Sequence, residues 1–572
     1  MSVARFAIIG SSSIFIFLAI LLVISRIPAP ETIPPAVFLA AASAISAVLL
    51  YINGGIRTLL TALLSIAGFV LLLFFWAYVT RSFYDTGHDS YAYHLRAVWD
   101  LADGWDPFVS EHKNIWVDSY PSGYWVLQSY VVSITGFLLS GHGMVTGLMA
   151  VTGLLAYGFF IERVTPPLGG FHHLAALIFA GIIAANPVVL TQLMTHYVDA
   201  PLYLMGTALV LFLMTDALSG NRLALWAAIA CIILLINTKT AALYFTPLII
   251  FGAFCMEMVL TNRENGFISR TLQWMKAKGF LYMFAGLFAI LVIGYKPYVT
   301  NVLHHGTLLY PSVDKIMAPN MPENVNALPV PVKFFYGIFS VTADNHWPIP
   351  IDAPIVLKIP GTFKKSEFKE LIFDTRRGGF GPYFSLAFLT SILAYGACRL
   401  AARNRSSYRW QRTGDGIAAF AIVLALTCMF FPESWWARYV PHAWLAAALF
   451  GLSSLFLSGN GKMMLAIRAL QWVAMVSFML CILAGLIGAG RQNLNTYKNT
   501  QEIHYMKELP MVELSIWKGG KVLYSSSVEI WEALLKMRGV KTRAIPDDQE
   551  PACNPPHYLW GGVHWCPLKE GE

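Results

Sequence analysis

The first strongly polar stretch of the chain, residues 84–100, combines groups that can exchange protons with groups that can stack on a substrate. Its sequence, YDTGHDSYAYHLRAVWD, holds three acids, two histidines, one arginine and four aromatic residues. Carboxylates and imidazoles commonly serve as general acids and bases in enzymes. Asp89 is the main candidate for such a role, because it follows Gly87 and His88 at the expected start of a helix.

The spacing after Asp89 predicts a short amphipathic helix over residues 89–103. Tyr93 at i+4 and Arg96 at i+7 share the face of Asp89, whereas His94 at i+5 lies largely off it. Such a helix would lie on the membrane surface with its aromatic residues as anchors. Tyr93 is then a candidate for the wall of a pocket, and His94 is a weaker candidate for contact with substrate.

Two roles are open for Asp89 at the start of this helix. The structural alternative is an N-cap, in which the carboxylate accepts a hydrogen bond from the first helical turn. The catalytic alternative is a carboxylate that the helix dipole keeps ionised and oriented, so that it takes a proton from a hydroxyl. If Asp89 is not the catalytic base, Asp85 is the next acid to test.

The elements around this stretch are expected to be membrane helices. The chain has 572 residues, of which 56% are hydrophobic and only 13% charged, about half the charged fraction of a soluble domain. Mean hydropathy is +0.57, and apolar runs near 20 residues recur, as in polytopic helical membrane proteins. The first run is expected to be a transmembrane helix, because it is long and no cleavage site follows promptly. The fourteen candidate runs are 6–26, 33–51, 58–80, 122–140, 143–161, 172–190, 201–218, 223–237, 240–260, 281–299, 382–397, 415–431, 441–457 and 469–489.

Basic loops predict the orientation of these runs. Residues 261–279 and 398–415 carry four and five Lys or Arg and are expected in the cytoplasm. Alternation from these loops places the polar segments 195–201, 237–240, 300–381, 432–439 and 490–572 outside. Segment 81–121 holds seven acids against three bases and is also expected outside. Three runs separate 81–121 from Asp199, although two external positions require an even number. One of 122–140, 143–161 and 172–190 therefore does not cross, and we expect about 13 transmembrane helices.

Two domains are predicted. Residues 1–489 form an all-α transmembrane domain with external loops 81–121 and 300–381. Residues 490–572 form a small external α/β domain, because VLYSSSVEIWEALLKMRGV has the pattern of a strand followed by a helix. Cys553 and Cys566 lie in this tail and form a disulfide if the compartment is oxidising. The other five cysteines lie in or beside apolar runs.

Composition and motifs exclude several classes of protein. The net charge of +8 comes largely from short basic loops between apolar runs, so no nucleic-acid partner is expected. Gly-rich nucleotide loops, internal repeats and the HExxH or CxxC spacings of dedicated metal sites are absent from the sequence.

Three cations stand at the external ends of apolar runs, where they could stabilise an anionic leaving group. They are Lys239, Lys296 and Arg438. Lys296 and Arg438 could instead snorkel to the interface. Lys239 interrupts apolar sequence from 223 to 260 with only NTKT, and a charge there is costly unless it has a function.

Three further residues are candidates for binding substrate. Asp199 either caps the helix that begins near Pro201 or acts as a second acidic or acceptor-binding group. Glu433 binds substrate or forms an ion pair with Arg438. His304, next to His305, either donates hydrogen bonds to sugar or phosphate or belongs to an ordinary loop.

Several of these segments together resemble the GT-C superfamily of membrane glycosyltransferases, which includes protein O-mannosyltransferases and the bacterial lipid A aminoarabinose transferase. An Asp follows an early membrane helix, an aromatic–His pair and a Gly-x-x-Pro follow it, and SYPSGYW leads into the next helix. The later segments NPVVLTQLMTHYVDAPLYL, PYVTNVLHHGTLLYP and WWARYVPHAWL are similar to loops of that family. The resemblance extends over about residues 85–445, in short and degenerate motifs. The extra apolar pair before the Asp departs from the family's simplest pattern.

The resemblance implies a GT-C-like fold and an inverting glycosyltransferase with its active site on the external face of the membrane. The short loops and compact tail favour a bacterial inner membrane, with the active site facing the periplasm, and an archaeal membrane is the alternative. The donor would be a polyprenyl-phosphate sugar, and the acceptor a hydroxyl of a glycan, lipid or protein in envelope glycan or exopolysaccharide synthesis. Asp89 matches the catalytic base. No metal or other cofactor is expected, and a divalent metal, as in oligosaccharyltransferases, is the alternative. The alternative functions are a lipid-diphosphate oligosaccharide polymerase or ligase, a transporter or flippase, and an assembly subunit.

Overall fold

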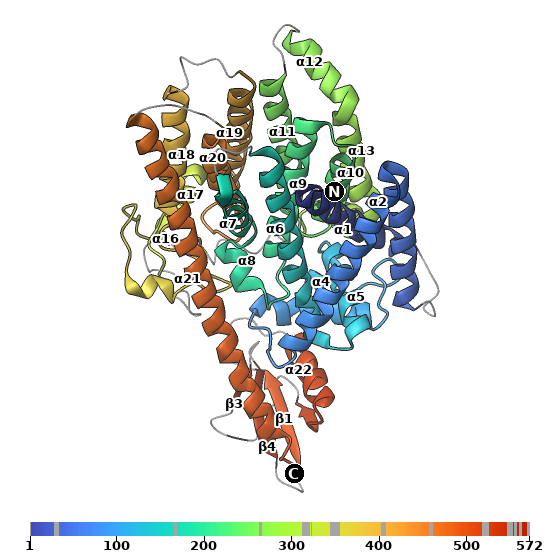
Figure 1. Cartoon of the computed structure of the whole chain (residues 1–572). Coiled ribbons are helices and arrows are strands. Elements are labelled where there is room, and N and C mark those ends of the chain that lie inside the picture. Colours follow the sequence, from blue (N-terminus) through green and yellow to red (C-terminus); the bar gives the residue numbers. More distant parts are fainter. Residues whose placement is uncertain are drawn as a thin grey trace.

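The chain forms a bundle of long helices with a small sheet domain beyond one end of it (Figure 1). The prediction of a mostly helical chain with many apolar helices is confirmed. This computed structural model describes residues 2–27, 34–164, 169–261, 266–311, 321, 323–343, 355–401, 408–456, 462–516, 525–545, 553, 557–559 and 563–568.

The apolar runs become helices because a helix satisfies its own backbone hydrogen bonds inside a bilayer. The longer helices of the bundle are α1 (Val3–Ile24), α2 (Pro35–Thr80), α6 (Gly143–Arg163), α7 (His172–Ala184), α9 (Asp199–Ser219), α10 (Arg222–Ile236), α11 (Ala242–Leu260), α18 (Phe384–Ala401), α19 (Tyr408–Met429), α20 (His442–Ser454) and α21 (Lys462–Met506). A further continuous stretch comprises α12 (Phe267–Trp274), η4 (Met275–Gly279), α13 (Phe280–Phe288) and η5 (Ala289–Ile293).

Short helices fill the connections between these long helices. They are η1 (Ser90–His94), α3 (Leu95–Ala102), α4 (Ile115–Asp118), α5 (Gly123–Thr135), η2 (Leu138–His142), η3 (Gly169–Phe171), α8 (Pro187–Gln192), η6 (Tyr295–Val299), α14 (Thr300–His305), α16 (Glu323–Asn326), α17 (Val330–Ile338) and η8 (Lys365–Phe368).

Nine helices in the described part of the chain are long and apolar enough to cross a membrane. Helices α7 and α10 are shorter but also apolar. These helices indicate a multi-pass membrane protein, since spanning the ~30 Å hydrocarbon core takes about 20 residues. The predicted number of about 13 crossings stays a prediction.

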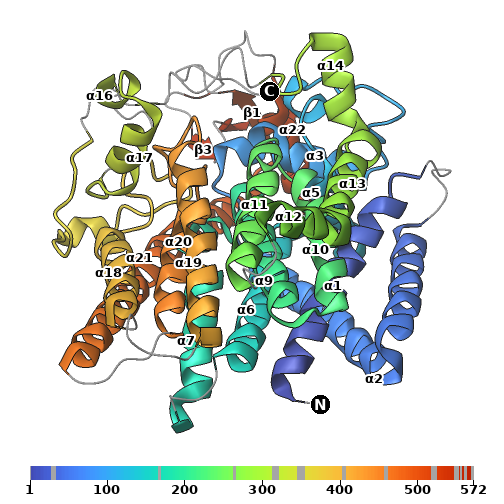
Figure 2. The ribbon, with the colours of Figure 1, turned by 90° about the horizontal axis from the view of Figure 1, so that it is seen from above.

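Helix α2 accounts for two of the predicted runs, 33–51 and 58–80. It changes direction at Gly55, whose φ of 68° lies in a region that glycine adopts without steric cost. Figure 2 shows its two limbs meeting at an angle. The two limbs therefore correspond to the two predicted helices.

One of the runs 122–140, 143–161 and 172–190 was expected not to cross the membrane. The first of them forms the helix that is least suited to do so. Helix α5 has 13 residues, a length of about 20 Å at 1.5 Å per residue. It ends at Gly136, which has a φ of 70°, and it packs against α3. By contrast, α6 has 21 residues, and α7 and α8 follow one another with a short break. Run 122–140 is thus the one that we remove from the predicted crossings.

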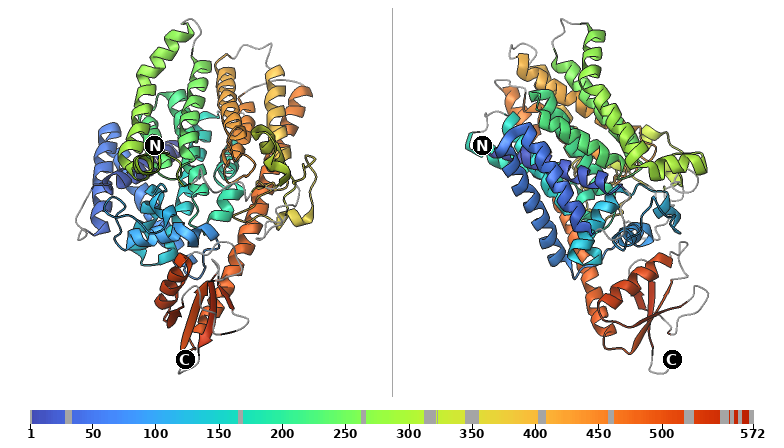
Figure 3. Two further views of the ribbon diagram at one scale, coloured as in Figure 1. Left: turned by 180° about the vertical axis from the view of Figure 1, so that it is seen from behind. Right: turned by 90° about the vertical axis from the view of Figure 1, so that its right-hand side faces the viewer.

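The C-terminal part contains the predicted helix as α22, whereas the predicted strand before it, at 522–524, lies outside the described residues. The described strands form a four-stranded sheet of order β2-β1-β4-β3. Helix α21 runs through residue 489 to Met506, so the predicted domain boundary falls inside this helix. Figure 3 shows the sheet beyond the helical bundle. A disulfide joins Cys553 to Cys566. The elements of this domain are β1 (Met511–Ile516), α22 (Ser525–Met537), β2 (Thr542–Ala544), β3 (His557–Leu559) and β4 (Val563–Leu568).

Candidate functional site

The predicted helix after Asp89 is present, with a different first turn. Residues Ser90–His94 form a π-helical turn, and α3 continues from it to Ala102. Asp89 is at the N-cap position, but its side chain makes no capping hydrogen bond. The Asp89 carboxylate therefore does not cap this helix, which was the structural alternative for it. Single π-helical turns often occur at functional sites.

The Asp89 carboxylate has one oxygen engaged and one free. Its Oδ2 accepts a hydrogen bond from Nη2 of Arg438 at 3.2 Å. Within the described chain its Oδ1 has no hydrogen-bond partner, and 28% of the side chain is exposed. The main-chain N–H of Asp89 donates to the Tyr197 hydroxyl at 3.2 Å, which fixes the backbone at this point.

Arg438 gathers three carboxylates around one guanidinium. Besides Asp89, it lies 3.1 Å from Asp374 and 3.9 Å from Asp199. The guanidinium carbon stands 4.2 Å from the ring centre of Trp436, as in a cation–π contact. Burial acts to lower the Arg438 pKa, but Tyr439 and the three carboxylates together raise it, so the group is cationic.

The Nε of Arg438 is buried and makes no hydrogen bond to a described residue, whereas Nη1 is in ion-pair contact with Asp374. Buried donors in this state are rare in proteins, and they often mark a place where another group binds. Arg438 therefore retains one donor, Nε, for a substrate oxygen.

Lys239 and Asp199 form a buried ion pair next to Arg438. Asp199 Oδ2 also accepts a hydrogen bond from Gln192 Nε2 at 3.1 Å. The Lys239 ammonium lies 4.3 Å from the ring centre of Tyr439. Asp199 is in the first turn of α9, where the helix dipole favours an anion. We call Asp89, Asp199, Lys239, Asp374 and Arg438 the Arg438 cluster.

Asp85 is buried in a different arrangement. Its Oδ1 accepts from the main-chain N–H of Gly87 at 2.7 Å. Its Oδ2 accepts from the main-chain N–H of His196 at 2.8 Å and lies 2.7 Å from His196 Nδ1. Both oxygens are occupied, so Asp85 holds the turn before Asp89 to the loop before α9.

Asp374 belongs to the cluster and was not predicted from the sequence. It lies in FDTRRGGFGPYF, where an acid precedes two arginines in a loop, a signal that could have drawn attention to it. Its second oxygen is 3.2 Å from Arg376 Nη2. Burial raises the pKa of Asp374, whereas Arg438 and Arg376 oppose that effect.

Aromatic side chains form a wall beside Asp89. Tyr93 stacks on Trp116 with ring centres 5.6 Å apart. Burial raises the Tyr93 pKa, and the nearby Asp89 carboxylate raises it further. His94 Nδ1 accepts a hydrogen bond from the Trp125 indole at 2.9 Å, and burial lowers the His94 pKa to about 3. His94 is therefore neutral, with its proton on Nε2.

Three predicted residues form other contacts. Lys296 pairs with Asp118 at 2.6 Å. His304 is exposed near the end of α14, where it neighbours His305. Glu433 accepts a hydrogen bond from the Trp435 indole at 2.7 Å, and burial raises the Glu433 pKa. The alternative ion pair of Glu433 with Arg438 does not form.

The contacts of the Arg438 cluster bring together loops that the charge pattern had placed on one side of the membrane. The loops that contribute to it are 81–121, 195–201, 237–240, 300–381 and 432–439. All five therefore meet on one face of the helical bundle.

In the part of the chain that the structure describes, no three His, Cys, Asp or Glu side chains lie together in a way that could hold a metal ion. No family model, curated protein or solved structure matches the chain. The resemblance to GT-C enzymes therefore depends on the sequence motifs alone.

Proposed function

We propose that the chain is an inverting glycosyltransferase that moves a sugar from a polyprenyl-phosphate donor to an acceptor hydroxyl. The observation that supports it best is the difference among four neighbouring carboxylates. Asp85, Asp199 and Asp374 have both oxygens engaged, whereas Asp89 keeps Oδ1 without a partner among the described residues. A general base needs such an oxygen within reach of the substrate.

In the proposed reaction, Oδ1 of Asp89 accepts the proton of the acceptor hydroxyl. The acceptor oxygen forms a bond to the anomeric carbon, while the bond from that carbon to the donor phosphate oxygen breaks with its electron pair. Attack opposite the leaving group inverts the anomeric carbon. Arg438 holds Oδ2 and thereby turns Oδ1 away from itself. General-base assistance of this kind contributes about 10²–10⁴-fold in rate.

The leaving polyprenyl phosphate needs positive charge nearby. Lys239 and Arg438 are the cations closest to Asp89 in the cluster, but each is already paired with carboxylates. The phosphate would therefore bind through the Nε of Arg438, which makes no hydrogen bond to a described residue. Lys296, paired with the half-buried Asp118, stays a second candidate.

The proposal includes a GT-C-like arrangement in a bacterial inner membrane, with the cluster facing the periplasm. The nine long helices, the second limb of α2, and the shorter α7, α10 and α20 together make thirteen crossings. An odd number puts the two ends of the chain on opposite sides, and basic loops in the cytoplasm favour a cytoplasmic N-terminus and an external sheet domain. A disulfide in that domain agrees with an oxidising compartment.

The test is sugar transfer by purified full-length protein with radiolabelled polyprenyl-phosphate sugars and a panel of hydroxyl acceptors. We expect wild type to transfer and Asp89→Asn to lose about 10²–10⁴-fold in kcat. The matched control is Glu111→Gln, which removes one charge from an exposed position on the same polar segment and should transfer normally.

Two results would contradict this function. Transfer only from a lipid-diphosphate oligosaccharide would indicate a polymerase or ligase. Movement of labelled solute into vesicles without any sugar transfer would indicate a transporter.

A further inference from the structure

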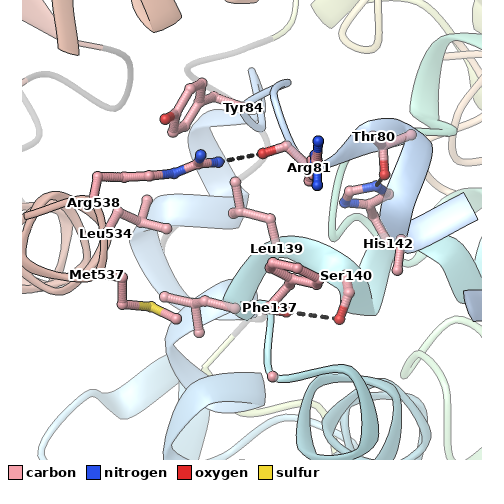
Figure 4. Close-up of a pocket in the computed structure, with 13 residues that line it drawn as sticks. Thr80, Arg81, Tyr84, Phe137, Leu139, Ser140, His142, Leu534, Met537 and Arg538 are labelled. Carbon is pink, nitrogen blue, oxygen red and sulfur yellow. Dashed lines mark hydrogen bonds between the residues drawn. The ribbon is translucent and has the colours of Figure 1, made fainter. Parts of the chain in front are cut away.

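Two adjoining hollows lie where the sheet domain meets the helical bundle. The first has a volume of about 170 Å³ and is lined by the end of α2, the connection from α5 to α6, and α22 (Figure 4). The second has a volume of about 460 Å³ and lies between α3, α5 and α22. They share Gly136, Leu138 and Met537. The larger one is within the range of ligand sites, about 300–1,000 Å³.

The walls of both hollows are mainly apolar. Phe137, Leu139 and Leu534 line the first, and Trp99 and Val132 line the second. Phe137 is 40% exposed, and Met537, at the junction of the hollows, is 59% exposed. An apolar ligand chain placed here would cover side chains that are otherwise in water.

Two guanidinium groups stand at the first hollow. Figure 4 shows Arg538, which directly follows α22, donating a hydrogen bond to the main-chain oxygen of Arg81. Arg538 also lies near the Tyr84 hydroxyl. The guanidinium carbon of Arg81 lies 4.5 Å from the ring centre of Tyr78. Neither arginine has an ion-pair partner among the described residues, so both positive charges are available to an anion.

The second hollow has no such excess of charge. Asp103 and Lys536, which carry opposite charges, both line it. A ligand that fits the pair of hollows therefore has an anionic group at the arginines and an apolar chain next to it.

The first hollow lies at the end of a helix that could cross the membrane. Arg81 is the C-cap of α2, whose second limb is long and apolar enough to cross the bilayer. Tyr78 and Val79, in the last turn of that limb, are 60% and 46% exposed and would face lipid. Arginine at the end of a membrane helix is placed to meet lipid phosphates.

We propose that this pair of hollows binds an anionic phospholipid of the surrounding membrane. Its phosphate contacts Arg81 and Arg538, and an acyl chain lies against Leu138 and Met537. Because Arg81 belongs to the bundle and Arg538 to the sheet domain, the lipid bridges the two domains. This site is separate from the Arg438 cluster and does not depend on the proposed transferase activity.

The test uses delipidated full-length protein in a neutral detergent, with the thermal unfolding midpoint followed during lipid titration. A ligand that binds the folded state raises this midpoint. We expect phosphatidylglycerol to raise it, and zwitterionic phosphatidylcholine or inorganic phosphate to raise it far less. Phosphate alone tests whether the acyl chain is needed.

Three variants test where the lipid binds. For each variant, the rise of the unfolding midpoint with lipid is measured relative to the midpoint of the same variant without lipid, so that a change in stability is not mistaken for a change in binding. Arg81→Gln/Arg538→Gln should weaken phosphatidylglycerol binding at least tenfold. Met537→Glu, at an exposed position, should weaken it by placing a negative charge beside the acyl chain. Lys507→Gln removes an exposed charge that lines neither hollow and should bind normally. Wild-type binding by both the double variant and Met537→Glu, or equal responses to all three probes, would overturn the proposal.

Discussion

At the scale of single residues, the carboxylates of the site differ in whether both of their oxygens have a hydrogen-bond or ion-pair partner. Asp89 keeps one free oxygen, while Asp85 and Asp374 do not. The sequence indicated Asp89 as the main candidate from its position before a helix. It could not separate Asp89 from Asp85, because the difference depends on His196, which is far away in the chain but contacts Asp85 in the fold.

His94 gives a prediction about stability and pH. The folded protein holds His94 neutral with a pKa of about 3, whereas an unfolded histidine has a pKa of about 6.5. Below pH 6.5 the unfolded chain binds a proton that the folded chain does not, so acid favours unfolding as the pH falls toward about 3. We expect the unfolding midpoint of His94→Gln to fall less than that of wild type between pH 7 and pH 5. Parallel curves for the two proteins would contradict this assignment.

At the scale of elements, helix α22 supports the segment that carries Asp89. The Trp531 ring lies 5.3 Å from that of Tyr84 and 5.7 Å from that of Tyr91. These two tyrosines flank the turn with Asp85 and Asp89, so the sheet domain packs directly on the segment that positions the proposed base. An ion pair between Arg96 and Glu529 joins the same two elements.

Replacing Trp531 should therefore reduce sugar transfer without touching the cluster. Trp531 is fully buried, and truncating such a side chain typically costs about 3–5 kcal/mol of stability. We expect Trp531→Ala to lower kcat by about tenfold or more at a temperature where it stays folded, because a small displacement of catalytic groups is costly. Trp472→Ala, at a 62% exposed position on α21, is the control. Equal kcat values for both variants would show that α22 does not position the segment.

At the scale of the whole molecule, the sequence predicted the helical architecture and the set of loops that meet at the cluster. Hydropathy and basic loops are enough to predict these helices and their order, because the backbone of a membrane helix forms its hydrogen bonds within that helix. The sequence did not separate α5 from the longer apolar helices, since its short length depends on a turn at Gly136 and packing on α3. Asp374 was missed because only the fold brings its loop to Arg438.

The proposed topology can be measured by labelling single introduced cysteines with a membrane-impermeant maleimide in intact cells. Asn53 is exposed next to the bend of α2, and Glu111 is exposed on the face that carries Asp89. One limb of α2 separates them, so they should lie on opposite sides of the membrane. We expect Glu111→Cys to react in intact cells and Asn53→Cys to react only after permeabilisation. The described native cysteines outside the disulfide are at least partly buried, which limits background labelling. The reverse pattern would contradict the orientation.

The central claim is that Asp89 is the base because its Oδ1 is free, and release of polyprenyl phosphate in a single turnover tests it most directly. Asp374→Asn is the comparison, since Asp374 contacts the same Arg438 but has both oxygens engaged. We predict that Asp89→Asn slows release by about 10²–10⁴-fold, while Asp374→Asn, checked by its unfolding midpoint, slows it at least tenfold less. Equal or larger slowing in folded Asp374→Asn, or wild-type release by Asp89→Asn, would contradict the account.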